Sequence, residues 1–198
     1  MKDNFLRFIE AIEYILLNQI KFIEDIDRLF LKPSLAGSII RLIASLSIAV
    51  GSTMLHPPYT KGFFATILLS QFANFALLTL VPYIIGSLID YFAQNKERPG
   101  RVRLMVLLTD YSTVVYFLFL PVSVVFVQAD IQGIGAYIFL FAVLTILYIL
   151  NISRGAKYLY DLKDKDSIKF AFFSFFITIS LPVVTSIFFS SAILSLLG

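Results

Sequence analysis

The sequence contains no cysteine, no tryptophan and a single histidine, His56. Without cysteine the chain has no disulfide, no thiolate nucleophile and no thiolate metal site. His56 stands in a His-Pro-Pro-Tyr turn with no second histidine or carboxylate at a ligand-like spacing, so we expect no metal and no cofactor. Glycine-rich phosphate loops and nucleophile motifs are also missing, and the sequence therefore predicts no enzyme.

Charge is scarce as well. Charged residues make up 15% of the chain and hydrophobic residues 59%, whereas about a quarter of the residues of a soluble domain are charged. The net charge is only +3, and the basic residues lie between apolar stretches rather than along one soluble face, so we expect no nucleic-acid binding. This composition predicts an integral membrane protein whose first partner is the lipid bilayer.

The apolar residues gather in five stretches, most of which reach the roughly 20 residues that a helix needs to cross a bilayer. The stretches cover about residues 37–55, 63–92, 104–127, 135–150 and 170–197, and the fourth is the shortest. The sequence therefore predicts an all-α integral membrane protein in which residues 33–198 form a bundle of five transmembrane helices.

The basic residues predict the orientation of this bundle. All but Lys61 of the 16 Lys and Arg residues lie before the first stretch, just inside it, or in the second and fourth connections. Cytoplasmic loops retain positive charge during insertion. Five spans then place the N-terminus in the cytoplasm and the C-terminus outside, whereas four or six spans would need a missing or an extra crossing that the hydropathy does not supply.

Residues 1–32 precede the first span and predict a cytoplasmic amphipathic helix. Apolar residues from Phe5 to Phe30 recur at the spacing of one helical face, and charged residues fill the other face. Pro33 ends the pattern, and the scattered charges exclude a secretory signal peptide. The sequence leaves two placements open, which are docking against the bundle or a partner, and lying in the membrane interface.

Three prolines interrupt apolar stretches, and each removes one backbone hydrogen bond of a helix. They are Pro82 in the second stretch, Pro121 in the third and Pro182 in the fifth. We expect a kink at each of them, which serves either helix packing or a cavity.

Four ionisable residues lie at one depth beneath the cytoplasmic boundary, namely Arg41, Asp90, Asp110 and Arg154. Ionisable groups inside a membrane are costly and mark structural pairs or functional sites. We predict an intramembrane charged layer in which the arginines neutralise the aspartates and Asp110 pairs with Arg41 or Arg154. The alternatives are interfacial charges that reach the headgroups, or a proton or ion relay.

The second connection carries a cluster of four basic residues, which are Lys96, Arg98, Arg101 and Arg103. Basic clusters directly cytoplasmic of a membrane span bind anionic lipid headgroups. The sequence therefore predicts lipid-headgroup contacts at this connection.

Three segments carry a resemblance to a known family. They are the Arg-Leu-Phe-Leu-Lys-Pro entry segment at 28–33, the stretch 103–121 with Tyr111-Ser112 and Pro121, and the connection from Ser153-Arg154-Gly155-Ala156 to Lys169-Phe170-Ala171. In this order, and with five spans, the chain resembles the Yip1 family of membrane proteins over about residues 28–197. With only about 30 residues before the first span, it looks like a short, prokaryotic-type member.

This resemblance implies a membrane-organising or trafficking-type scaffold that acts through its cytoplasmic face, with other membrane proteins or a second copy as partners. Eukaryotic members work with Rab-type small GTPases, but this chain lacks their long polar N-terminal region. The short form implies the bacterial inner membrane, with the ER or Golgi membrane as the alternative. The residues themselves leave a second function open, which is a small-solute or ion transporter or channel with Asp110 in the pathway.

Overall fold

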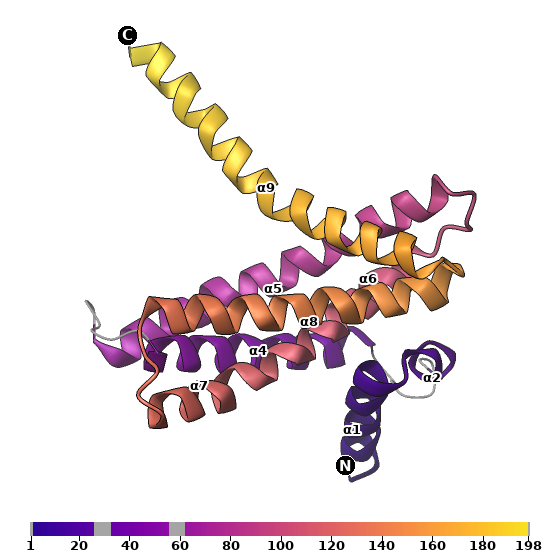
Figure 1. Cartoon of the computed structure of the whole chain (residues 1–198), viewed down its shortest axis with the longest axis horizontal. Coiled ribbons are helices and arrows are strands. Elements are labelled where there is room, and N and C mark those ends of the chain that lie inside the picture. The colour runs from indigo at the N-terminus through magenta and orange to yellow at the C-terminus, as the bar shows by residue number, and fades with distance from the viewer. Residues whose placement is uncertain (1, 26–32, 56–61, 198) are drawn as a thin grey trace.

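The computed structural model describes residues 2–25, 33–55 and 62–197, and for residues 2–5, 8, 19, 33, 34 and 181–197 it describes the backbone alone. All elements of the described chain are helical. In order they are α1 (Lys2–Leu17), α2 (Gln19–Glu24), α4 (Pro33–Leu55), α5 (Phe63–Gln94), α6 (Val102–Tyr111), the 3-10 helix η1 (Ser112–Leu118), α7 (Phe119–Gln128), α8 (Ile134–Tyr160) and α9 (Asp164–Leu197) (Figure 1).

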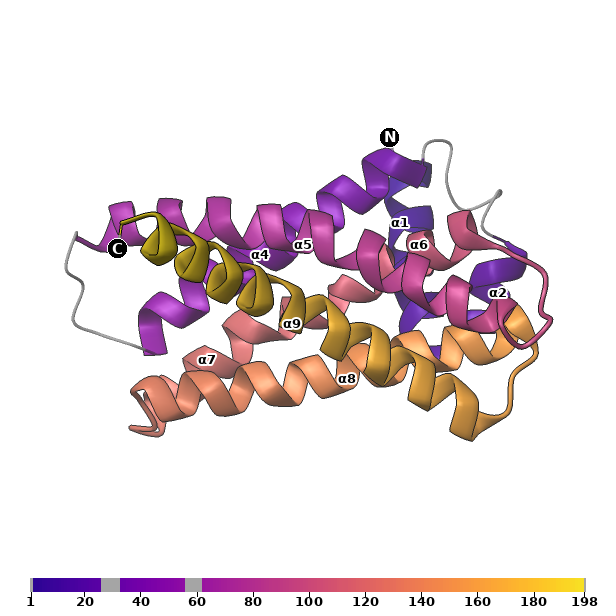
Figure 2. The ribbon, with the colours of Figure 1, turned by 90° about the horizontal axis from the view of Figure 1, so that it is seen from above.

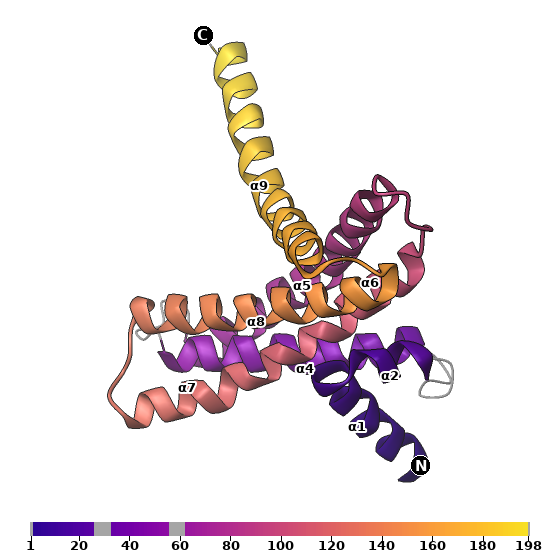
Figure 3. The ribbon, with the colours of Figure 1, turned by 45° about the vertical axis from the view of Figure 1, so that its right-hand side comes forward.

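Four rods run side by side to form the bundle, and these are α4, α5, the continuous unit α6-η1-α7, and α8 (Figures 1 and 2). Their apolar segments Leu35–Leu55, Phe63–Gln94, Val102–Gln128 and Ile134–Tyr160 are each long and apolar enough to cross a membrane. The predicted fifth span, 170–197, falls within α9, which packs on α5 and α8 at its start and then leaves the bundle (Figure 3). The side chains of its second half lie outside the described residues.

The fourth span is longer than the sequence predicts. The sequence predicts that the stretch 135–150 ends before a charged connection, but α8 continues for a further ten residues to Tyr160. The reason is a second buried face made of Ser153, Gly155, Ala156 and Leu159, which packs inside the protein although charged residues stand between its members. Arg154 consequently lies within the helix and not beyond it.

Hydrogen bonds between connections fix the two ends of the bundle. At one end the Gly133 amide donates to the Leu55 carbonyl at 2.6 Å, which joins the end of α4 to the start of α8. At the other end Arg98, in the α5–α6 connection, donates to the carbonyl of Asp161, directly after α8. We call this second end, which carries residues 95–101 and 161–163, the basic end.

The N-terminal segment forms two helices rather than the single helix predicted for residues 1–32. Asn18 breaks the periodic pattern, because its side chain caps α2 by accepting a hydrogen bond from the Lys21 amide at 3.3 Å. Ala11, Ile15 and Phe22 are fully buried against the bundle, where α1 contacts α6 and η1 and α2 contacts α8. The last part of the predicted helix, residues 26–32, lies outside the described residues.

A single serine accommodates Pro121 in the third span. Pro121 has no amide hydrogen, so the carbonyl of Phe117 loses its helical donor. The hydroxyl of Ser47 on α4 donates to this carbonyl at 3.0 Å and accepts from the Leu120 amide at 2.9 Å. The chain just before Pro121 forms the 3-10 helix η1, which is wound more tightly than an α-helix. In place of the expected kink, the structure thus has a 3-10 segment that is hydrogen-bonded to α4.

The second span contains Pro82 and bends part-way along its length (Figure 2). Beyond this proline α5 approaches α6 so closely that a Cβ atom on Gly86 would lie 2.8 Å from the Cα of Val106. A side chain at position 86 would therefore push two backbones apart. The third expected kink, at Pro182, lies outside the described side chains.

We predict that Gly86→Ala lowers the free energy of unfolding by about 1–3 kcal/mol, because the new methyl group overpacks the α5–α6 contact. Thermal unfolding of the protein in detergent micelles measures this change. Gly135→Ala is the matched control, since a Cβ atom there meets no atom within 4 Å. Equal melting temperatures for the two variants would contradict the close approach.

Candidate functional site

An ion pair joins α4 to α6 inside the bundle. Arg41 Nη1 lies 2.7 Å from Asp110 Oδ1 and 2.8 Å from Oδ2, and Arg41 Nη2 donates to the hydroxyl of Ser38 at 2.9 Å. The two side chains are only 9% and 8% exposed. Of the two partners that the sequence left open for Asp110, the structure places Arg41 against it.

The two charges lie at the same depth. Arg41 and Asp110 each stand eight residues after the start of their helices at Pro33 and Val102, which is about 12 Å along each helix. A charge at that depth costs several kcal/mol unless it is paired. The pair therefore fixes the register between the first and the third span.

A glycine makes room for this pair. A Cβ atom on Gly37, one turn before Arg41, would overlap the carboxylate of Asp110. Sequence reasoning did not select Gly37 or Ser38, although their positions four and three residues before Arg41 put them on the same helical face. That spacing is the signal from which both could have been found.

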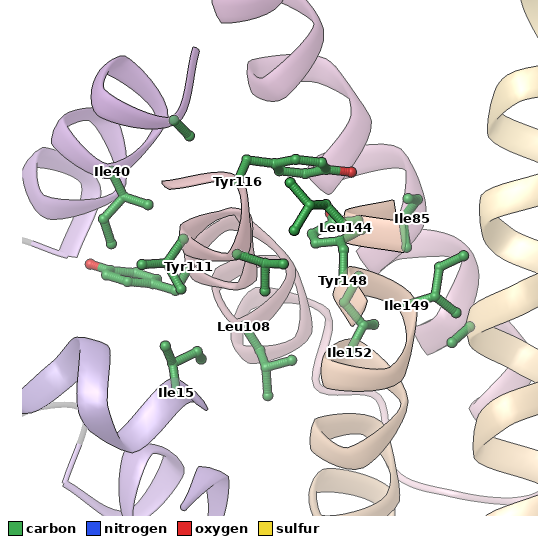
Figure 4. Packing of buried hydrophobic residues seen from close by; sticks show 14 of the residues in the cluster. Ile15, Ile40, Ile85, Leu108, Tyr111, Tyr116, Leu144, Tyr148, Ile149 and Ile152 are labelled. Carbon is green, nitrogen blue, oxygen red and sulfur yellow. The ribbon is translucent and has the colours of Figure 1, made fainter. Parts of the chain in front are cut away.

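Tyr111, the next residue after Asp110, connects the pair to the N-terminal helices. Its ring is buried and points toward Ile40 of α4 and Ile15 of α1 (Figure 4). The ring of Phe22 in α2 lies 5.4 Å from it, measured between centroids. Docking of α1 and α2 thus covers Tyr111 directly beside the ion pair.

Asp90 is buried in a separate polar cluster and forms an ion pair with none of the described arginines, which corrects the predicted neutralisation by Arg41 or Arg154. It accepts hydrogen bonds from the hydroxyl of Tyr160 at 2.5 Å, the amide of Arg101 at 2.6 Å and the side-chain amide of Gln94 at 2.6 Å. Three donors to one carboxylate satisfy a buried charge without a counter-ion. The cluster joins α5, the α5–α6 connection and the end of α8.

Two of the predicted headgroup contacts bind the end of α8. Arg98 Nη2 lies 2.8 Å from the Asp161 carbonyl, and Arg101 Nη1 lies 3.2 Å from the Leu159 carbonyl. Cations at a helix C-terminus satisfy free carbonyl groups and oppose the negative end of the helix dipole. Lys96 and Arg103 are exposed and remain candidates for headgroup contacts.

Arg154 is exposed and stands apart from both clusters. The four residues of the predicted layer thus occupy three places, which are the Arg41–Asp110 pair, the Asp90 cluster and an open surface. The described residues contain no group of three or more His, Asp or Glu that could hold a metal ion. The basic end therefore combines helices that are joined by buried polar contacts with a cationic surface.

No family model, no curated protein and no solved structure matches the chain. The resemblance to the Yip1 family therefore stays a prediction from its three sequence segments.

We predict that Asp110→Asn and Arg41→Gln each lower the free energy of unfolding by about 3–5 kcal/mol, because each leaves one buried charge unpaired. The double variant leaves no such charge. We therefore expect its loss of unfolding free energy to be clearly smaller than the sum of the losses in the two single variants. Unfolding in mixed micelles measures the three values. Asp130→Asn, an exposed carboxylate at the opposite end, is the control. Strictly additive losses would contradict the pairing.

We also predict that Tyr160→Phe lowers the free energy of unfolding by about 1.5–3 kcal/mol, since it removes a hydrogen bond to a buried carboxylate. Tyr91→Phe is the matched control because Tyr91 is 59% exposed. Thermal unfolding of both variants in the same detergent gives the comparison. A Tyr160 variant as stable as the Tyr91 variant would show that the Asp90 cluster does not need this hydroxyl.

Proposed function

We propose that this protein is a non-enzymatic, multi-pass membrane scaffold of the Yip1-like type, which organises other membrane components through its basic end. The observation that carries the proposal is the division of charge at that end. The buried ionisable groups Arg41, Asp90 and Asp110 are all engaged by partners within the chain, while several cations remain on the surface. The paired interior groups favour a structural role, and the surface cations favour binding of other membrane components.

The surface cations that support recruitment come from both connections at the basic end and the residues next to them. Lys96, Arg103, Lys163 and Lys165 are all exposed. None of the four forms an ion pair with a described residue. A cationic surface of this kind attracts acidic protein segments and anionic membrane surfaces over about 8 Å, the screening length at physiological salt.

The topology in this proposal extends beyond the four spans. It includes residues 170–197 of α9 as a fifth span, a cytoplasmic basic end and an amphipathic character of the segment before Pro33. The excess of basic residues at one end supports the orientation. Exposed apolar residues such as Leu6, Ile9 and Leu17 on α1, next to a buried face, support contact of this helix with both lipid and bundle.

Transport through Asp110 is the less favoured function. A carboxylate that relays protons or ions has to exchange its partner during each cycle. Asp110 instead accepts two short hydrogen bonds from Nη1 of Arg41, and Nη2 of the same guanidinium donates to Ser38. This arrangement suits a permanent cross-link.

The proposal predicts that partner capture depends on the exposed cations and not on the interior. We expect the quadruple variant Lys96→Gln, Arg103→Gln, Lys163→Gln, Lys165→Gln to remain in the membrane and to lose most crosslinked protein partners. Crosslinking in native membranes, followed by affinity capture and mass spectrometry, measures this loss.

The matched control exchanges the same four residues between lysine and arginine, which keeps the charge, and we expect it to retain the partners. An unchanged partner set in the glutamine variant, or no enriched partner for the native protein, would contradict a scaffold that acts through this end.

A further inference from the structure

A groove runs between α1 and α8 along the side of the bundle. It consists of two adjoining cavities of about 260 and 250 Å³ that share Leu16 and Arg154. Its floor is η1, and its walls are α1 and one face of α8. We call it the α1–α8 groove.

The groove changes chemistry along its length. The part farther from the basic end is lined by apolar side chains, among them Ile12, Val115, Leu118, Leu147 and Leu150. Toward the basic end the lining includes Asn18 and Tyr158. The first and the last α8 residue of the lining are Leu147 and Tyr158. They lie eleven residues apart, so the groove extends about 16 Å along α8.

Arg154 stands where the apolar and the polar parts meet. Unlike Arg41, Arg98 and Arg101, it makes no hydrogen bond or ion pair with any described residue. As far as the described residues go, no Asp or Glu lines either cavity. The groove therefore carries an uncompensated positive charge at its centre.

The position of the groove matches the level of lipid headgroups and upper acyl chains. Arg154 lies six residues before the end of α8 at Tyr160, which is about 9 Å below the basic end. Leu17, at the corner of α1, is 80% exposed and borders the groove. An apolar residue this exposed beside a membrane-spanning helix indicates that lipid reaches the mouth of the groove.

From this geometry we infer that the α1–α8 groove binds one anionic phospholipid of the surrounding bilayer. The phosphate contacts the guanidinium of Arg154, because arginine is suited to planar, charge-assisted hydrogen bonds with phosphate oxygens. One acyl chain enters the apolar part between α1, η1 and α8, and the remainder of the headgroup lies toward Tyr158 and Asn18. The bound lipid fills the space beneath α1 and holds this helix on the bundle.

This site is independent of the partner recruitment proposed above, since none of the four exposed cations of that test lines the groove. Failure of one proposal therefore leaves the other standing.

The test uses the full-length protein in uncharged detergent micelles, titrated with phosphatidylglycerol or with phosphatidylcholine. Native mass spectrometry counts bound lipid, and the melting temperature reports stabilisation. We expect one phosphatidylglycerol to bind with a rise in melting temperature and phosphatidylcholine to bind at least tenfold more weakly. Inorganic phosphate alone should give no shift.

Two variants separate the parts of the groove. Arg154→Gln should weaken phosphatidylglycerol binding about tenfold, an energy of about 1.4 kcal/mol, while Arg7→Gln, an exposed arginine outside the lining of the groove, should not. Leu150→Trp should block the acyl chain, while Ile146→Trp, on an exposed α8 position outside the lining, should bind lipid as the native protein does.

Equal binding of the two lipids, equal binding by native protein and Arg154→Gln, or an effect of inorganic phosphate alone would each overturn the proposal. So would unchanged binding by Leu150→Trp, because the chain would then lie elsewhere.

Discussion

The buried ion pair between Arg41 and Asp110 is the contact on which the arrangement of the bundle depends. Within a membrane, helices gain little from hydrophobic burial against each other, since lipid is as apolar as their side chains. An unpaired charge at that depth is strongly unfavourable, so the first and the third span have to meet where these two residues stand. Gly37 allows the approach, and Tyr111, the next residue, provides the surface on which the N-terminal helices dock.

The same logic recurs around Asp90, with hydrogen-bond donors in place of a counter-ion. Together the two clusters join the helices α4, α5, α6 and α8, while the opposite end is held by a backbone hydrogen bond from Gly133 and by close packing at Gly51. This leaves the basic end both rigid and cationic. A rigid, charged face is suited to presenting contacts to proteins and lipids, and the groove beside Arg154 gives lipid a defined place in it.

Much of this architecture follows from hydropathy, but the partners of the polar residues do not. The apolar stretches predicted the first three spans to within a few residues, and the depth of Arg41 and Asp110 follows from counting along helices. Counting residues along a helix gives the depth of a side chain but not the neighbouring helix that it faces. The sequence therefore leaves two possible partners for Asp110.

Other features were missed because their causes lie far away in the sequence. The bond from Tyr160 to Asp90 joins residues 70 positions apart, and the repair of the Pro121 interruption comes from Ser47 on another helix. The break at Asn18 was hidden because the apolar period continues through it, while the cap depends on one side-chain hydrogen bond. The end of α8 was misplaced because charged residues near Arg154 resemble a loop, although the opposite face of the helix is buried.

Proton flux tests most directly whether the central ion pair is a permanent cross-link. Proteoliposomes with an imposed pH gradient would contain the native protein or the double variant Arg41→Gln, Asp110→Asn, each shown to be folded. The account predicts that both leak protons at the rate of protein-free vesicles. A flux that the native protein carries and the double variant lacks would contradict it and assign Asp110 to a transport pathway.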